Sequence, residues 1–218
     1  MANSRIDCCG EEYFTMTAYT RDSDVEYVQM NFDVPLDIIL SEYQTVKDKL
    51  IVHRPEDGHK DWYAVTLYGF DSDKTNSHWE YRKRGMKPGV TTVGEHCPQT
   101  LEWVKSLPYA RIDDVRFLVI KPGGYIAKHR DVPERNWLEP LNISLTYPTG
   151  SKFVLNDKLV NYKPGVGLIL NIHYEHYVEN NSTEERIHLL VHGKKNKDFW
   201  SEASDTPGTI NILKEAST

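Results

Sequence analysis

The sequence has few cysteines and no long apolar run. Its three cysteines, Cys8, Cys9 and Cys97, cannot all pair within one chain, and two adjacent thiols are poorly placed to bridge each other. This usage favours reduced thiols in a cytoplasmic protein. No apolar segment approaches the length that spans a membrane, and the first residues lack the apolar core of a secretory signal. We therefore expect no membrane partner and a cytoplasmic location.

The chain also lacks an excess of positive charge. Its 26 Lys and Arg residues are outnumbered by 32 Asp and Glu residues, which gives a formal net charge of -6 at pH 7. Because nucleic-acid binding usually depends on clustered Lys and Arg, the composition predicts no nucleic-acid partner. A phosphate-binding loop is missing as well, because Pro122–Gly124 is expected to form a turn between two strands and does not open a helix.

Hydrophobic periodicity predicts helices in the first half of the chain and strands in the second. The apolar residues of Val34–Leu50 fall on one stripe of an amphipathic helix, and Pro98–Ser106 is a second helix that Pro108 stops. Beyond residue 114 the pattern is short strands with turns, including a hairpin at Phe153–Val160.

The length of 218 residues is ample for one compact domain. We expect residues 1–218 to form a single domain. Within it, residues 1–110 would be a supporting region, residues 111–195 a strand-rich core, and residues 196–218 a polar C-terminal arm.

Two histidines and one aspartate are the strongest chemical signal. Alternate side chains of a strand share a face, so His129 and Asp131 can project together while Arg130 points away. His176 could supply a third ligand if its strand lies beside the first. Two imidazoles and a carboxylate leave one face of an octahedral metal open, which suits Fe(II) and oxygen chemistry. A His-x-Asp pair alone is more often a surface ion pair, but this one ends the expected strand Tyr125–His129.

Arg186 lies just before the apolar run Ile187–His192. A buried guanidinium needs an anionic partner, and its planar shape pairs best with a carboxylate. The distal carboxylate of 2-oxoglutarate is such a partner. The alternative is that Arg186 pairs with Glu184 or Glu185 on a solvated turn. The spacing between His176 and Arg186 favours the first interpretation.

Together these segments resemble the aspartyl/asparaginyl β-hydroxylase-type branch of the Fe(II)/2-oxoglutarate oxygenases, which also includes free L-proline cis-hydroxylases. The matching segments are Arg116–Asp131, Leu141–Tyr147, Tyr162–Gly165 and His176–Val191. The resemblance implies that His129, Asp131 and His176 hold iron and that Arg186 binds the distal carboxylate of 2-oxoglutarate. The β-hydroxylases proper have a glycine where this chain keeps Asp131, so the chain looks nearer to the proline hydroxylases.

The resemblance also points to further contacts with the cosubstrate. The branch usually presents Arg or His near position 142, where this chain has Asn142, with Ser144 next on the same face. Both side chains can donate hydrogen bonds to a carboxylate, but either could instead be a satisfied polar group in a barrel strand. His188 lies on the same face as Arg186 and could reach the cosubstrate or be buried for structural reasons.

The expected fold is mainly β with α, a double-stranded β-helix or cupin-like jelly-roll barrel buttressed by N-terminal helices; its winding comes from the resemblance. The expected function is Fe(II)- and 2-oxoglutarate-dependent hydroxylation of a C–H bond by O2. The substrate would be a small molecule or peptide, with an amino acid or peptidyl side chain as the leading choice, and succinate and CO2 would be released.

Two alternatives remain open at this point. One is a non-catalytic jelly-roll module that binds or senses a small molecule through its metal, although a pure binder has no need of three open iron positions. The other is a cupin-type metal enzyme that does not use 2-oxoglutarate and usually adds a further His or Glu ligand. The sequence decides neither the oligomeric state nor the choice between hydroxylation, desaturation and cyclisation.

Overall fold

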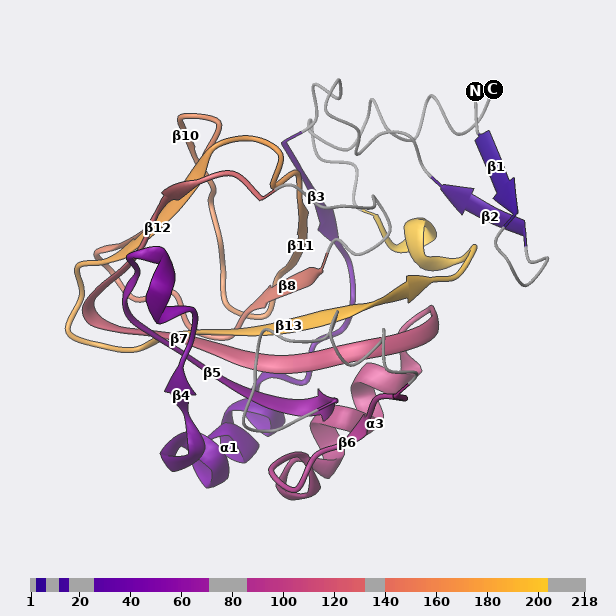
Figure 1. Cartoon of the computed structure of the whole chain (residues 1–218), viewed down its shortest axis with the longest axis horizontal. Coiled ribbons are helices and arrows are strands. Elements are labelled where there is room, and N and C mark those ends of the chain that lie inside the picture. Colours follow the sequence, from indigo (N-terminus) through magenta and orange to yellow (C-terminus); the bar gives the residue numbers. More distant parts are fainter. Residues whose placement is uncertain (1–2, 7–11, 16–25, 71–85, 132–139, 204–218) are drawn as a thin grey trace.

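A computed structural model describes residues 3–6, 12–15, 26–70, 86–131 and 140–203 of the chain (Figure 1). Strands β1 (Asn3–Ile6) and β2 (Glu12–Thr15) form a separate antiparallel pair. The other strands make one antiparallel sheet of 11 strands. They are β3 (Tyr27–Met30), β4 (Ile51–Val52), β5 (Lys60–Gly69), β6 (Gly89–Val90), β7 (Tyr109–His129), β8 (Leu141–Ser144), β9 (Ser151–Leu155), β10 (Lys158–Leu159), β11 (Gly167–Leu170), β12 (His176–Asn180) and β13 (Arg186–Lys195).

The long strand β7 divides this sheet into two halves. Up to Ile120 it pairs with β13, and from Tyr125 onward it pairs with β12. The first half therefore runs β7-β13-β8-β11-β3, with β5 on the other side of β7, and the second runs β7-β12-β9-β10. Successive strands β8, β9, β11, β12 and β13 return to one half and then the other, which is the winding of a jelly roll. The expected fold class is confirmed.

The prediction of a turn at Pro122–Gly124 is wrong, because β7 continues through it. On the neighbouring strand, Lys60 pairs with Tyr125 and Trp62 pairs with Ile120, so β7 carries extra residues at this point. Gly123 takes a positive φ of 73° there. Pro122–Gly124 therefore forms a β-bulge within β7 rather than a turn. The bulge lets β7 continue from one half of the sheet into the other.

Two helices cover the outer face of the first half of the sheet, below β5, β7 and β13 in Figure 1. They are α1 (Leu36–Val46), which the 3-10 turn η2 (Lys47–Lys49) follows, and α3 (Pro98–Ser106). The prediction of two buttressing helices is confirmed. Ile39 and Tyr43 of α1 are fully buried in the cluster that joins the helices to the sheet.

Strand alternation separates this outer cluster from the barrel interior. On β13, Ile187 and Leu189 pack beneath the helices, whereas Leu190 belongs to a second cluster with Leu118 of β7. Because alternate residues of a strand share a face, Arg186 and His188 lie on the same inner face as Leu190. Both are almost fully buried.

The remaining connections include a hairpin and short 3-10 turns. The predicted hairpin is present as β9 and β10, and its turn residues Asn156 and Asp157 have φ values of 52° and 59°. Short 3-10 turns lie in other connections of the described chain. They are η3 (Pro55–Asp57), η4 (Gly94–His96) and η5 (Phe199–Glu202). Phe199 of η5 is fully buried in the outer cluster.

Cys97 is buried as a free thiol, and Cys8 and Cys9 lie outside the described residues. Within the part of the chain that the structure describes, no helix has both the length and the apolar character needed to cross a bilayer.

Candidate metal centre

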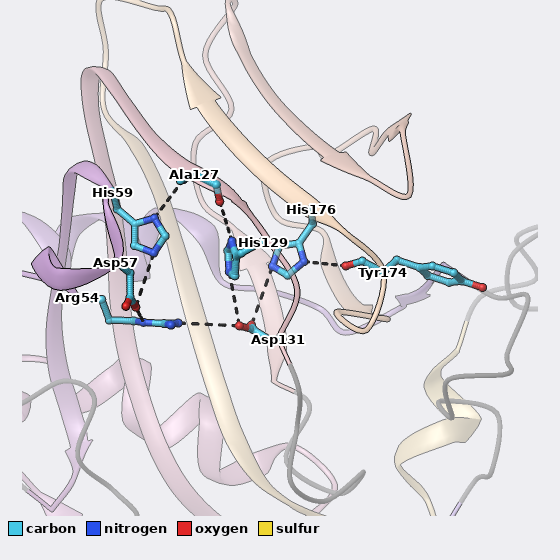
Figure 2. Close-up of polar contacts among 8 residues, drawn as sticks. All are labelled: Arg54, Asp57, His59, Ala127, His129, Asp131, Tyr174 and His176. Carbon is cyan, nitrogen blue, oxygen red and sulfur yellow. Dashed lines mark hydrogen bonds and ion pairs between the residues drawn. The ribbon is translucent and has the colours of Figure 1, made fainter.

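The two histidines of the predicted ligand set come from adjacent strands. His129 ends β7, His176 begins β12, and the two residues pair directly across the ladder. Their ring centroids lie 4.3 Å apart. Asp131 follows β7, where its backbone N–H donates to the carbonyl of Ile172 at 3.1 Å. Its Oδ1 is 3.5 Å from His129 Nε2, and its Oδ2 is 3.9 Å from His176 Nε2 (Figure 2). The structure therefore brings the three candidates together, with ligand atoms all within 4.8 Å of one another.

Backbone carbonyls fix the orientation of both imidazoles. His129 Nδ1 lies 2.7 Å from the carbonyl oxygen of Ala127, and His176 Nδ1 lies 3.0 Å from that of Tyr174. Because a carbonyl only accepts hydrogen bonds, each Nδ1 must carry the proton and donate it. In a neutral ring this leaves Nε2 as the unprotonated atom, and both Nε2 atoms face Asp131 (Figure 2). Such outer hydrogen bonds are what a metal-binding histidine requires.

The surroundings of the three groups favour a divalent cation. A protonated His129 ring can also donate from Nε2 to Asp131, and this hydrogen bond raises the pKa of His129, whereas burial lowers the pKa of His176. Burial opposes ionisation of Asp131, but the hydrogen bond from His129 and the nearby imidazoles outweigh it and lower the pKa of the carboxyl. Asp131 is therefore a carboxylate at neutral pH. Among the described residues no fourth His, Cys, Asp or Glu joins the group.

Arg186 is a buried cation that no described carboxylate neutralises. Its side chain lies against the rings of Tyr147 and Tyr162, with centroid distances of 5.8 and 5.7 Å, and burial lowers its pKa to about 10. Its Nε has no hydrogen-bond partner among the described residues. Glu185 instead accepts a hydrogen bond from Tyr43 at 2.8 Å and pairs with Lys121. The solvated pairing of Arg186 with its neighbouring glutamates is therefore not formed.

Aromatic side chains connect Arg186 to the metal ligands along the inner face. The ring of Phe153 stacks on His176 at 6.0 Å and meets Tyr162 edge-on at 5.8 Å. Tyr162 in turn contacts both Arg186 and His188. The buried hydroxyl of Tyr162 has no partner within the described part of the chain. Phe153 and Tyr162 thus form an aromatic wall beside His176. At its far end, the Arg186 guanidinium and the Tyr162 hydroxyl can both bind an anion.

The three further candidates lie beside this wall. His188 Nδ1 is 2.5 Å from Asn142 Oδ1, and burial lowers the pKa of His188 well below its usual range. The histidine is therefore neutral, and its buried Nε2 has no partner among the described residues. Ser144, paired with His188 across the ladder, donates to the carbonyl of Thr146 at 3.3 Å. Cosubstrate binding by Asn142, Ser144 and His188 stays a prediction.

The structure adds residues that the sequence did not single out. Arg54, Asp57 and His59 lie in the segment between β4 and β5. Arg54 and His59 lie beside the metal ligands, and Asp57 pairs with both of them (Figure 2). Arg54 Nη1 is 3.9 Å from Asp131 Oδ1, and His59 Nδ1 accepts a hydrogen bond from the N–H of Ala127 at 3.0 Å. The only sequence signal is a polar segment with two histidines just before a strand. Its position at the metal centre depends on how β5 pairs with β7, which local sequence does not encode.

Comparison with known proteins gives a family. The sequence model described as "Aspartyl/Asparaginyl beta-hydroxylase" matches residues 36–196, a range that contains all of the site residues above. A search of curated proteins found no match.

Several solved structures are similar at low sequence identity. A Pseudomonas putida prolyl-4-hydroxylase is 13% identical, with 79% of this chain and 94% of the other covered and a TM-score of 0.46. A viral collagen prolyl hydroxylase from Paramecium bursaria Chlorella virus-1, solved with 2-oxoglutarate, is 16% identical, with 78% and 96% covered and a TM-score of 0.47. A Trichoplax adhaerens prolyl hydroxylase is 10% identical, with 83% and 89% covered and a TM-score of 0.46. The strand order, rather than these likenesses, identifies the barrel.

Proposed function

The chain belongs to the aspartyl/asparaginyl β-hydroxylase family of Fe(II)- and 2-oxoglutarate-dependent hydroxylases, and on that premise we propose that it hydroxylates a C–H bond of an amino acid or of a peptidyl side chain. The observation that carries the proposal is the convergence of His129, Asp131 and His176 on one inner face of a barrel that also holds Arg186, a buried cation that no carboxylate of the described residues neutralises.

The side chains present fit Fe(II). Two Nε2 atoms, freed by backbone hydrogen bonds at Nδ1, and one carboxylate form the donor set that suits this ion and leaves positions open to other molecules. His129, Asp131 and His176 would hold the metal. When bound, Fe(II) and 2-oxoglutarate supply the activation of O2, with succinate and CO2 as co-products.

Arg186 fits the distal carboxylate of 2-oxoglutarate. A buried guanidinium without a counter-ion is stabilised by a ligand that carries a carboxylate. Its planar end can donate two parallel hydrogen bonds to that carboxylate. The hydroxyl of Tyr162, buried beside the guanidinium, can donate a further one. Asn142, Ser144 and His188 would border the cosubstrate along the same face. Phe153 and Tyr162, both buried in the inner hydrophobic cluster, would help to keep water away from these groups.

The protein's own contribution is therefore positioning. Backbone carbonyls of β7 and of the turn before β12 fix the imidazoles, and the arginine orients the cosubstrate from β13. A small molecule or a peptide remains the proposed substrate. A cytoplasmic location remains a proposal that follows from cysteine usage.

The test is a screen of free amino acids and short peptides for substrate-stimulated succinate release. The protein is supplied with Fe(II), 2-oxoglutarate and O2, and products are examined for the gain of one oxygen atom. We expect His176→Ala to lose turnover and His96→Ala, a matched change of an exposed histidine in η4, to keep it. Equal turnover in wild type and His176→Ala would overturn the proposal.

A further inference from the structure

The segment between β4 and β5, residues 53–59, reaches the metal centre from the N-terminal half of the chain (Figure 2). Arg54 Nη1 lies 3.9 Å from Asp131 Oδ1, while Arg54 Nε donates a hydrogen bond to Asp57. Five residues further along, His59 accepts the hydrogen bond from Ala127 N–H. A segment remote in sequence therefore contacts both the carboxylate ligand and the strand end that carries His129.

Asp131 has less support of its own than the two histidines. Each imidazole is tied to a backbone carbonyl, whereas Asp131 lies beyond the end of β7 and its side chain is 36% exposed. Within the described part of the chain, its carboxylate makes polar contacts with His129, His176 and Arg54. Apart from the other two ligands, Arg54 is thus the one described group that can fix the orientation of this carboxylate.

Arg54 is itself firmly held. Its φ of 49° lies in the left-handed region, which residues other than glycine seldom adopt. The surrounding segment maintains this conformation, because His53 N–H donates to Trp62 O at 2.8 Å and Asp57 N–H donates to Arg54 O at 3.2 Å. A strained backbone that neighbouring contacts maintain is a common feature of functional sites.

The same segment is coupled to the histidine ligand. Ala127 donates its N–H to His59 and accepts the Nδ1 proton of His129 at its carbonyl, so one residue of β7 links the two rings (Figure 2). The ring centroids of His59 and His129 lie 5.5 Å apart. The segment and the end of β7 therefore form one hydrogen-bonded unit.

We propose that Arg54 is a positioning residue of the metal centre: its guanidinium, braced by Asp57, holds the Asp131 carboxylate so that it faces the same point as the two imidazoles. This inference rests on the proposed function. A direct role for Arg54 in binding a substrate carboxylate fits less well, because the guanidinium already lies between two carboxylates, which more than balance its single positive charge.

Metal affinity is the direct test, and it needs no substrate. Metal-free full-length protein is titrated with Co(II), an oxygen-stable probe, and the result is checked with anaerobic Fe(II). Arg54→Met should weaken binding roughly 10- to 100-fold, the usual cost of removing an outer partner of a ligand. Arg54→Lys should restore part of the loss and Asp57→Asn should fall between. Arg111→Met, which removes a half-exposed arginine paired with Asp113, should bind as wild type.

Two further readouts separate positioning from other roles. Unfolding of the metal-free protein should be the same in Arg54→Met and Arg54→Lys, while the visible Co(II) spectrum changes more in the Met variant. Equal weakening in both variants with lower stability would mean a merely structural role and would overturn the proposal. Unchanged metal affinity with a raised substrate KM would overturn it in favour of substrate binding.

The His176→Ala variant keeps this inference distinct from the proposed function. Loss of Co(II) binding in His176→Ala with wild-type binding in Arg54→Met removes only the role of Arg54. Wild-type binding in His176→Ala removes the metal centre itself, and the inference with it.

Discussion

Replacing Arg186 with methionine should stabilise the cosubstrate-free protein while weakening its binding of 2-oxoglutarate. Burial lowers the pKa of Arg186 from its ordinary range to about 10, which corresponds to a charged state about 3 kcal/mol less favourable than in water. No described carboxylate offsets this cost. Methionine fills a similar length without a charge, so Arg186→Met should raise the free energy of unfolding by up to about 3 kcal/mol.

The effect on binding has the opposite sign. Removing a guanidinium that pairs with a buried carboxylate costs about 3 kcal/mol or more, which is roughly a hundredfold in Kd. Urea unfolding of the metal-free protein measures the first effect, and calorimetric titration of 2-oxoglutarate in the presence of Mn(II) measures the second. Arg111→Met serves as the control for a half-exposed arginine. An Arg186→Met protein that is less stable than wild type but binds 2-oxoglutarate normally would refute the reasoning.

Three further predictions concern stability and reactivity. Glu42 accepts hydrogen bonds from Gln99 N–H and Thr100 N–H at 2.9 and 2.8 Å and therefore caps the N-terminus of α3. Glu42→Ala should lower the free energy of unfolding by about 1–2 kcal/mol in urea titrations. An unchanged unfolding midpoint would contradict a capping role for Glu42. Burial lowers the pKa of His53 to about 2, so the folded ring stays neutral while the unfolded ring gains a proton below about pH 6.5. Stability should therefore fall as pH drops below 6.5, and His53→Gln should flatten this dependence when unfolding is followed from pH 7 to 5; an equally steep profile in the variant would count against it. Burial raises the pKa of the Cys97 thiol to about 12, so iodoacetamide at pH 7.5 should label it far more slowly in native than in urea-unfolded protein, and equal rates would show that the thiol is accessible.

Local rules accounted for part of the site in advance. Strand alternation is enough to place His129 and Asp131 on one face and to turn Arg186 inward when Ile187 and Leu189 face the helices. Predicting His176 as the third ligand required the family resemblance, because local sequence patterns do not show which strands pair when they lie far apart in the sequence. The observed register places His176 directly opposite His129.

Other features depended on tertiary contacts that the sequence does not display. Pro122–Gly124 reads locally as a turn, but pairing with β5 on one side and with β12 and β13 on the other keeps β7 continuous through a bulge. Glu185 could have neutralised Arg186, yet Tyr43 of α1 draws its carboxylate to the outer face. Arg54 meets Asp131 only because β5 aligns with β7, so no pattern around Arg54 could reveal its partner.

The central claim is that this barrel binds Fe(II) and 2-oxoglutarate together. The most direct measurement is anaerobic addition of Fe(II), then of 2-oxoglutarate, to metal-free protein while the weak visible charge-transfer band of a chelated keto acid is followed. We predict that the band forms in wild type, is absent in His176→Ala, and needs roughly a hundredfold more 2-oxoglutarate in Arg186→Met. Binding of iron by wild type with no band at saturating 2-oxoglutarate would contradict the account.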